Sequence, residues 1–210
     1  MKSKLFFSII ITSFVLFTFS ISCSEDKETL STEQDNEVAK YQKLNHAGDE
    51  LAKSLGINAK VNVTDIINGK NDRVVKITNS VKSSIKNDWD YDNATTIEFL
   101  TEEGKEVISI AIPNVSNPNI LLCSIEFEGE NCTFGLKRLF DEENNTISYI
   151  LDESVPNNSK GFLSCMRGFF NSDIGTTVEI LGVAGAVGCV ACGAVAAFYT
   201  GVAALGCSVA

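Results

Sequence analysis

The sequence predicts an α+β fold: an N-terminal helix on an antiparallel strand meander, followed by a small, apolar, all-α C-terminal domain. Three observations lead to this prediction. Apolar residues recur at helical spacing over residues 37–55, and strand-like segments separated by short turns fill residues 95–151. Residues 180–210 carry no charged side chain, so the composition changes sharply toward the C-terminus.

The chain begins with a segment typical of export signals. Lys2 and Lys4 precede an apolar run over residues 5–19, and small residues then lead to Cys23. A positive start, an apolar centre and a small-residue cleavage region together predict a signal peptide over residues 1–22, which is not part of the fold. An uncleaved N-terminal membrane anchor is the alternative.

The position of Cys23 resembles the acylation site of bacterial lipoproteins, in which a lipidated cysteine becomes the mature N-terminus. It directly follows Ser20-Ile21-Ser22, and the "SEDKE" after it is similar to the export signal of surface lipoproteins in Bacteroidota-type bacteria. The resemblance implies a lipid bilayer as partner, through acylated Cys23, and an outer-membrane or cell-surface location. Each buried methylene of an acyl chain contributes about 0.8 kcal/mol. The polar residues 23–36 are expected to form a flexible tether.

Residues 37–151 are predicted to form one acidic α+β domain. The helix of residues 37–55 comes first, and a less regular stretch follows in which "DRVVKIT" is compatible with a strand. "TTIEFLT" and "KEVISIAI" then flank a turn at 102–104, and "NILLCSIEFE" and "CTFGLKRLF" flank a turn at 129–131. With "TISYILD", these segments predict five strands in an antiparallel meander, with the helix packed on one face.

A polar linker over residues 152–161, which contains Pro156, is expected to lead to a tail domain of residues 162–210. The apolar pattern there predicts a helix over residues 174–200. One ridge of this helix consists of small residues spaced by four: Gly185, Cys189, Gly193, Ala197 and Gly201. Such a ridge lets a second helix approach closely, as in membrane helix pairs. The alternatives are a buried helical hairpin that turns near Thr200-Gly201 and a C-terminal transmembrane anchor.

Six of the seven cysteines remain once Cys23 is assigned to lipid. An even number beyond the inner membrane, in an oxidising compartment, favours disulfides, and reduced, buried cysteines are the alternative. The disulfide candidates are Cys165, Cys189, Cys192, Cys207, Cys123 and Cys132. The four in the tail allow three pairings, which the sequence leaves open.

Charge and motif content argue against several functional classes. The chain has 17 basic and 27 acidic residues, a net charge of −10, so nucleic acid phosphates would repel it. The C-x-x-C of residues 189–192 lies in an apolar helix, outside the strand–helix context of a redox motif. Asp88, Asp90 and Asp92 alternate as in a calcium loop, but Asn93 replaces its glycine. We expect no enzyme, no cofactor, no metal site, no nucleic acid partner and no small-molecule substrate.

The tail resembles the Cys-, Gly- and Ala-rich C-terminal peptides of halocin-type bacteriocin precursors, through "FLSCMRGFF" followed by "GCVACGAVAAFYTGVAALGC". The resemblance implies a secreted, bacteriocin-like toxin-precursor lipoprotein. Its apolar peptide, closed by disulfides among the four tail cysteines, would be released and would perturb target cell membranes. The expected partner of the tail is thus a target membrane or a second copy of the tail. The alternative function is a non-toxic surface lipoprotein, binding or structural, whose tail is a buried helical hairpin or a membrane-inserted segment.

Overall fold

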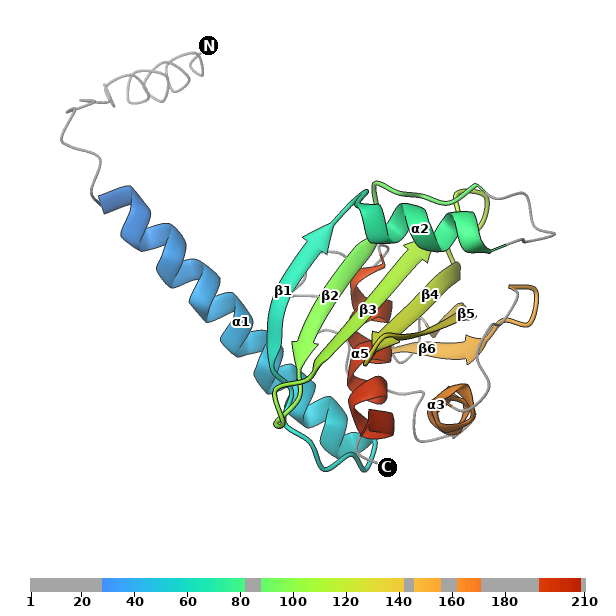
Figure 1. The fold of residues 1–210 in the computed structure, drawn as a ribbon. Helices are drawn as coiled ribbons and strands as arrows, with labels where there is room; N and C mark the ends of the chain where they lie inside the picture. Colours follow the sequence, from blue (N-terminus) through green and yellow to red (C-terminus); the bar gives the residue numbers. More distant parts are fainter. Residues whose placement is uncertain (1–27, 82–87, 142–145, 156–161, 171–192, 209–210) are drawn as a thin grey trace, which may run out of the picture. The chain divides into compact units, whose positions relative to one another are not determined.

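Six strands form one antiparallel sheet, ordered as they occur along the chain (Figure 1). In this computed structural model they are β1 (Val63–Asn68), β2 (Thr95–Leu100), β3 (Glu106–Pro113), β4 (Ile120–Phe127), β5 (Glu130–Asp141) and β6 (Thr146–Leu151). The structure describes residues 28–81, 88–141, 146–155, 162–170 and 193–208. The predicted α+β class and antiparallel meander are confirmed.

The helices that accompany the sheet are α1 (Glu28–Ser54), α2 (Asp72–Ser80), α3 (Phe162–Phe170) and α5 (Ala194–Ser208). The chain falls into two units, residues 1–36 and 37–210. Among the described residues, the first unit contains only the opening turns of α1. The rest of α1 and every other helix and strand belong to the second unit. The helix predicted over residues 37–55 is therefore present, but it begins earlier, within the predicted tether, where glutamate, leucine and glutamine favour helix.

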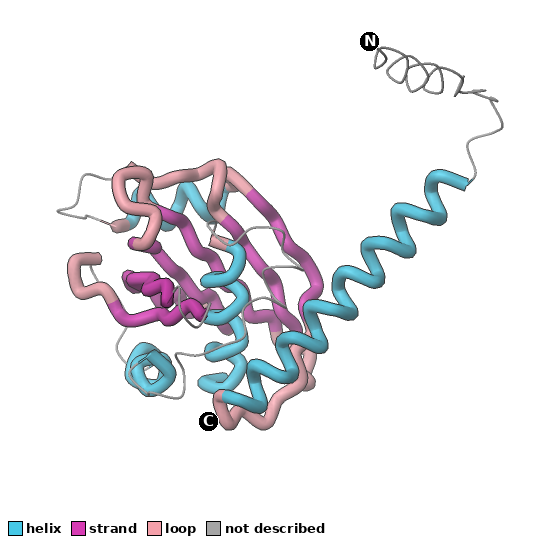
Figure 2. The backbone as a smooth tube through the Cα atoms, turned by 180° about the vertical axis from the view of Figure 1, so that it is seen from behind, coloured by secondary structure: helices cyan, strands magenta, loops and turns pink. Residues whose placement is uncertain are grey.

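Both faces of the sheet are covered by apolar layers, because successive side chains of a strand point to opposite faces. Val107, Ala111 and Cys123 belong to the layer that contains α5. Ile108 and Ile110 belong to the opposite layer, which contains α2. Figures 1 and 2, which view the sheet from opposite sides, both show α5 running across one face of the strands. With both faces covered, every residue of β3 after the first is buried.

The segment "DRVVKIT", expected to be compatible with a strand, forms helix α2 instead. Asn71 caps the helix, since its side-chain oxygen accepts a hydrogen bond from the Val74 N–H at 3.0 Å. Val74, Ile77 and Val81 are three or four residues apart and are all buried in the layer beneath α2. Helical spacing combined with a capping residue therefore outweighs the β-branched composition. Strand β1, just before α2, was not predicted.

The two hairpin turns agree with the sequence prediction to different degrees. The β2–β3 turn lies at 102–104 as predicted, and the Gly104 N–H donates to the Thr101 carbonyl at 2.9 Å. The β4–β5 turn lies earlier than predicted, at Glu128 and Gly129, which have φ values of 49° and 82°. Two positive φ values are typical of a two-residue type I′ turn, so β5 already begins at Glu130.

The described residues do not support a separate all-α C-terminal domain. Met166 and Phe170 of α3 and the residues of α5 belong to the same apolar core as the strands. Because α5 is apolar around its whole circumference, it can be buried between the sheet and other helices. The helix also runs through Thr200 and Gly201 without a break, so the alternative of a hairpin that turns there is wrong. Residues 174–192 of the predicted helix 174–200 lie outside the described residues.

Candidate functional site

Helix α5 is the longer of the two described helices in the predicted functional tail, and it is buried along most of its length. Every residue from Gly193 to Leu205 is buried. The helix packs against β2, β3 and β4 on one side and contacts α3. Helix α1 also reaches it, because a methyl group added at Gly48 would lie 3.1 Å from the Phe198 ring. The part of the tail that forms α5 thus belongs to the core.

Two glycines allow α5 to approach the sheet closely. A methyl group at Gly201 would overlap the Phe99 ring of β2, and one at Gly193 would overlap the Ala111 carbonyl of β3. The Gly193 N–H also donates to the Asn93 carbonyl at 2.9 Å. Gly193 and Gly201 therefore face the sheet, whereas the sequence predicted a second helix there; Gly206 near the end of α5 instead approaches Ile57 and Phe169.

The predicted ridge of small residues is only partly described. Gly193, Ala197 and Gly201 lie in α5 or directly before it, and all three are buried. Gly185 and Cys189 lie outside the described residues. The contacts of the described part of the ridge are with strands β2 and β3, so its spacing serves helix–sheet packing.

A buried polar contact joins α5 to the middle of β3. Ser109 Oγ and Thr200 Oγ1 lie 2.7 Å apart, and both residues are fully buried. Thr200 Oγ1 also donates to the Ala196 carbonyl at 2.8 Å. With Ser109 donating to Thr200, both hydroxyls are satisfied, as buried polar groups require.

Aromatic rings connect α3, α5 and the β5–β6 end of the sheet. The Tyr199 ring lies 5.5 Å from that of Tyr149 and 5.7 Å from that of Phe170, and Phe170 lies 5.7 Å from Phe134. The Tyr199 hydroxyl donates to the Phe169 carbonyl at 3.5 Å. Burial raises the pKa of Tyr199 to about 12, because the ionised phenolate is poorly solvated there.

A disulfide joins Cys165 of α3 to Cys207 near the end of α5, with the two Cα atoms 5.9 Å apart. Both cysteines were predicted as disulfide candidates, and both are half-buried. Of the three pairings that four tail cysteines allow, this bond leaves only Cys189 with Cys192. These two lie outside the described residues.

The other two candidates, Cys123 and Cys132, lie on adjacent strands within the core. The register of β4 and β5 pairs Cys123 with Phe134 and Ile125 with Cys132, so the two cysteines are diagonal neighbours on one face. Burial, with a smaller contribution from nearby Cys132, raises the pKa of the Cys123 thiol well above its usual range. Cys123 carries no disulfide, which fits the alternative of a reduced, buried cysteine acting as a small apolar side chain.

Helix α1 hydrogen-bonds the edge of the sheet at β1. Asn45 Oδ1 accepts from the Val63 N–H and Asp49 Oδ1 accepts from the Val61 N–H, each at 2.8 Å. Asn45 and Asp49 are four residues apart and thus lie on one face of the helix. Open backbone groups of an edge strand can pair with another chain, so these two side chains help to close this edge.

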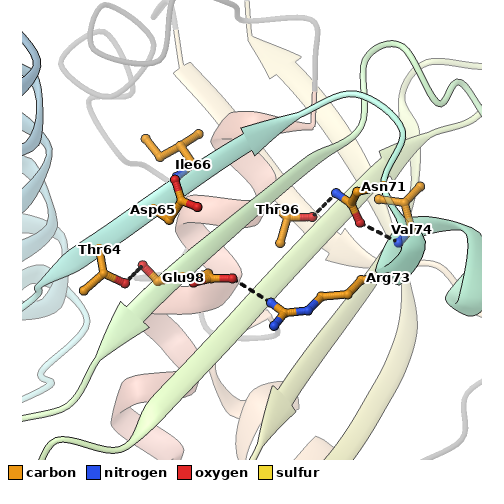
Figure 3. Close-up of polar contacts among 8 residues, drawn as sticks. All are labelled: Thr64, Asp65, Ile66, Asn71, Arg73, Val74, Thr96 and Glu98. Carbon is orange, nitrogen blue, oxygen red and sulfur yellow. Dashed lines mark hydrogen bonds and ion pairs between the residues drawn. The ribbon is translucent and has the colours of Figure 1, made fainter.

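A polar network lies where α2 meets β1 and β2 (Figure 3). Arg73 donates to Glu98 at 2.7 Å, Asn71 donates to Thr96 at 3.0 Å, and Thr64 donates to the Glu98 carbonyl at 3.3 Å. The Arg73 side chain is 41% exposed, so the ion pair contributes at most about 1 kcal/mol. The network positions α2 and contains no pairing of a nucleophile with a base.

A surface hollow lies between the loop after α1 and the β2–β3 hairpin. It consists of two adjoining parts of about 260 and 400 Å³. Four residues line both parts: Asn58, Ala59, Lys60 and Glu102. No sequence pattern indicated this hollow, because it forms between segments about 40 residues apart in the chain, and Glu102 was assigned only to a turn.

Lys105 lines the smaller part of the hollow and is held by two carboxylates. Its ammonium nitrogen lies 2.8 Å from Glu128 and 3.4 Å from Glu103, and 5.9 Å from the centroid of the Phe127 ring. Hydrogen bonds to Glu128 and Glu103 raise the pKa of Lys105. Lys105 therefore has its own charge partners, whereas Lys60 and Glu102 form no ion pair within the described residues.

The acidic stretch at residues 88–92 runs from a β-bridge between Trp89 and Asn114 into a turn, where Asp90 accepts hydrogen bonds from the Asn93 backbone N–H and side-chain amide, at 3.2 and 2.7 Å. Within the described ranges, no three histidine, cysteine, aspartate or glutamate side chains gather as a metal site would require. In the same ranges, no helix combines the length and apolar character needed to cross a bilayer. The predicted acylation site, Cys23, lies outside them.

Comparison with known proteins adds no relative. No protein-family model matches the sequence, and neither a curated protein nor a solved structure matches it significantly. The functional proposal therefore depends on the contacts described above and on the sequence features of the two ends of the chain.

Proposed function

We propose that this chain is a non-toxic, lipid-tethered surface protein whose uncharged tail completes the fold of a non-catalytic binding domain. The observation that carries the proposal is the burial of α5 from Gly193 to Leu205 within the core of the sheet. The signal-like residues 1–22, Cys23 and the acidic residues after it support export and acylation.

The energetics of α5 favour a tail that stays in place. Phe198, Val202 and Leu205 are each at most 1% exposed, and burying a large apolar side chain contributes about 1.5–3 kcal/mol. Removing α5 would also uncover Phe99 and leave Ser109 without its hydroxyl partner. A membrane would have to compensate for all of these losses before the tail could insert.

A bacteriocin-like toxin precursor is the second candidate, and one observation favours it. Both cysteines of the Cys165–Cys207 disulfide follow the predicted linker 152–161 in the chain. This bond lies within residues 162–210, so it would not hold that fragment to the rest of the chain after a protease cut the linker. That fragment would also contain the uncharged residues 180–210.

Truncation separates the two candidates. A chain that ends before Pro156 should lose cooperative unfolding if the tail completes the core, whereas a chain that begins at Glu37 lacks only the first unit and should keep it. Cooperative unfolding of the tail-less chain would contradict the proposal. Dye release from liposomes by oxidised residues 162–210, together with killing of related strains, would establish the second candidate.

Acylation is tested separately, by Cys23→Ala. The variant should retain its signal peptide or be released unanchored, and unchanged membrane fractionation would contradict the tether. Intact mass of the native protein from membrane and medium, with and without reduction, then distinguishes a full-length lipidated species from a released C-terminal fragment.

A further inference from the structure

The hollow beside the β2–β3 hairpin contains opposite charges that do not pair with each other. Lys60 and Glu102 line both of its parts. Within the described part of the chain neither forms an ion pair, while Lys105 in the same hollow binds Glu103 and Glu128. Lys60 and Glu102 therefore remain available, on the walls of one concavity, for a ligand that carries both charges.

In the smaller part of the hollow, Glu103 and Lys105 pair with each other, so Lys60 and Glu102 are the charged lining residues that form no ion pair within the described residues; Lys53 lines only the larger part. Asp49, which lines the larger part, already accepts the Val61 N–H. Asn58 adds a side-chain amide that can donate and accept. Hydrogen bonds in which one partner is ionised are stronger than neutral ones, so an ammonium and a carboxylate on one small molecule would match Glu102 and Lys60.

Apolar side chains form another part of the hollow's lining. Leu205 of α5 is 1% exposed, Phe127 of β4 is half-buried, and Ala59 lines both parts of the hollow. The smaller part holds about 260 Å³, below the range of roughly 300–1,000 Å³ typical of pockets for drug-sized ligands. The smaller part, which Leu205 and Phe127 line, thus suits a molecule the size of an amino acid with an apolar side chain.

We propose that this hollow binds a free α-amino acid with an apolar side chain. Its carboxylate contacts Lys60, its ammonium group contacts Glu102, and its side chain lies against Leu205 and Phe127. The inference names a ligand class for the binding domain and rests on the proposed function for that role. Because Leu205 belongs to α5, the buried tail supplies part of the binding surface.

The test is calorimetric titration of the full mature chain with L-leucine, N-acetyl-leucinamide and glycine. N-acetyl-leucinamide keeps the side chain but lacks both charges, and glycine keeps both charges but lacks the side chain. Leucine should bind at least about tenfold more tightly than either, a difference of about 1.4 kcal/mol. Lys60→Gln and Glu102→Gln should each weaken leucine binding by about tenfold or more.

Lys137→Gln on β5 and Glu153→Gln after β6 are matched controls, since both residues are exposed and neither lines the hollow. They should leave leucine binding unchanged, and thermal unfolding should confirm that all four variants fold. The inference is overturned if leucine does not bind below about 10 mM, if N-acetyl-leucinamide or glycine binds equally well, or if Lys60→Gln and Glu102→Gln have no effect. Any of these results leaves the truncation test of the proposed function unaffected.

Discussion

Gly201→Ala tests directly whether the apolar tail belongs to the core. In an exposed helix the change would be favourable, because alanine has a helix propensity about 1 kcal/mol better than glycine. In α5 the added methyl group would overlap the Phe99 ring. Phe99 is fully buried, and its ring centroid lies 6.0 Å from that of Phe198, so it has little room to move.

The expected net effect follows from these two opposing contributions. Overpacking a well-packed core costs about 1–3 kcal/mol, and the propensity gain offsets about 1 kcal/mol of that. We expect Gly201→Ala to destabilise the protein by up to about 2 kcal/mol, which lowers Tm by up to about 8 °C in a domain of this size. Gly168→Ala is the matched control, because Gly168 is an exposed helical glycine of α3 with no atom within 4 Å of the added methyl group.

Thermal unfolding by circular dichroism compares the two variants with the parent. Gly168→Ala should raise Tm by about 2–4 °C, corresponding to about 1 kcal/mol, while Gly201→Ala lowers it. Adding Phe99→Leu to Gly201→Ala should recover part of the loss. If Gly201→Ala raises Tm as much as Gly168→Ala does, α5 does not pack on Phe99, and the core burial on which the proposed function depends is wrong.

Three further predictions concern stability. Replacing Cys165 and Cys207 with serine removes a cross-link between positions 42 residues apart, which costs about 4 kcal/mol in the chain-entropy model; equal urea midpoints for the oxidised parent and the variant would contradict this. Burial raises the pKa of Tyr199 to about 12, whereas an unfolded tyrosine ionises near about pH 10. The free energy of unfolding should therefore have its full value below about pH 10 and fall by up to about 1.4 kcal/mol per pH unit between about pH 10 and about pH 12. Urea unfolding of the Tyr199→Phe variant should not show this fall. Asn71→Ala removes the cap of α2 and should cost about 1 kcal/mol, while Asn71→Asp, which can still cap, should cost less in the same assay.

The tail in the core also bears on how the protein can be engineered. A tag or fusion after α5 would follow Cys207, which is tied to α3 by the disulfide. A tag before Glu37 would join the first unit and leave the core of residues 37–210 intact.

Local periodicity was enough to predict most of the sheet and the first helix. The strands from β2 to β6 were recognised because short turns interrupt apolar runs, and a glycine with positive φ closes the hairpin at 102–104. The helical spacing of Val38, Tyr41, Leu44, Leu51 and Leu55 predicted α1, although Val38 is 51% exposed and Leu55 follows the last residue of the helix. These patterns are local, since each depends on residues that are close together in the chain.

Where a segment was short, the sequence left its structure ambiguous. "DRVVKIT" suits a strand by composition and a helix by spacing. Packing of Val74 and Ile77 in the same apolar layer as Ile108 of β3 favours the helix. β1 went unrecognised because an irregularity between Val63 and Asp65 breaks its alternation. Its place in the sheet depends on pairing with β2, about 30 residues later.

The sequence by itself determined that the last residues had to leave water, because a segment without a single charge between Ile180 and Ala210 is poorly accommodated in solvent. It could not determine what covers them, since the hydrophobic effect is non-directional and a bilayer, a second helix or a sheet would each remove the same apolar surface. Small residues at four-residue spacing permit close approach to any of these. Only the tertiary structure decided between them for α5, by placing Gly193 and Gly201 against strands. The same long-range packing brings Cys207 to Cys165 and Leu205 to the hollow beside Lys60.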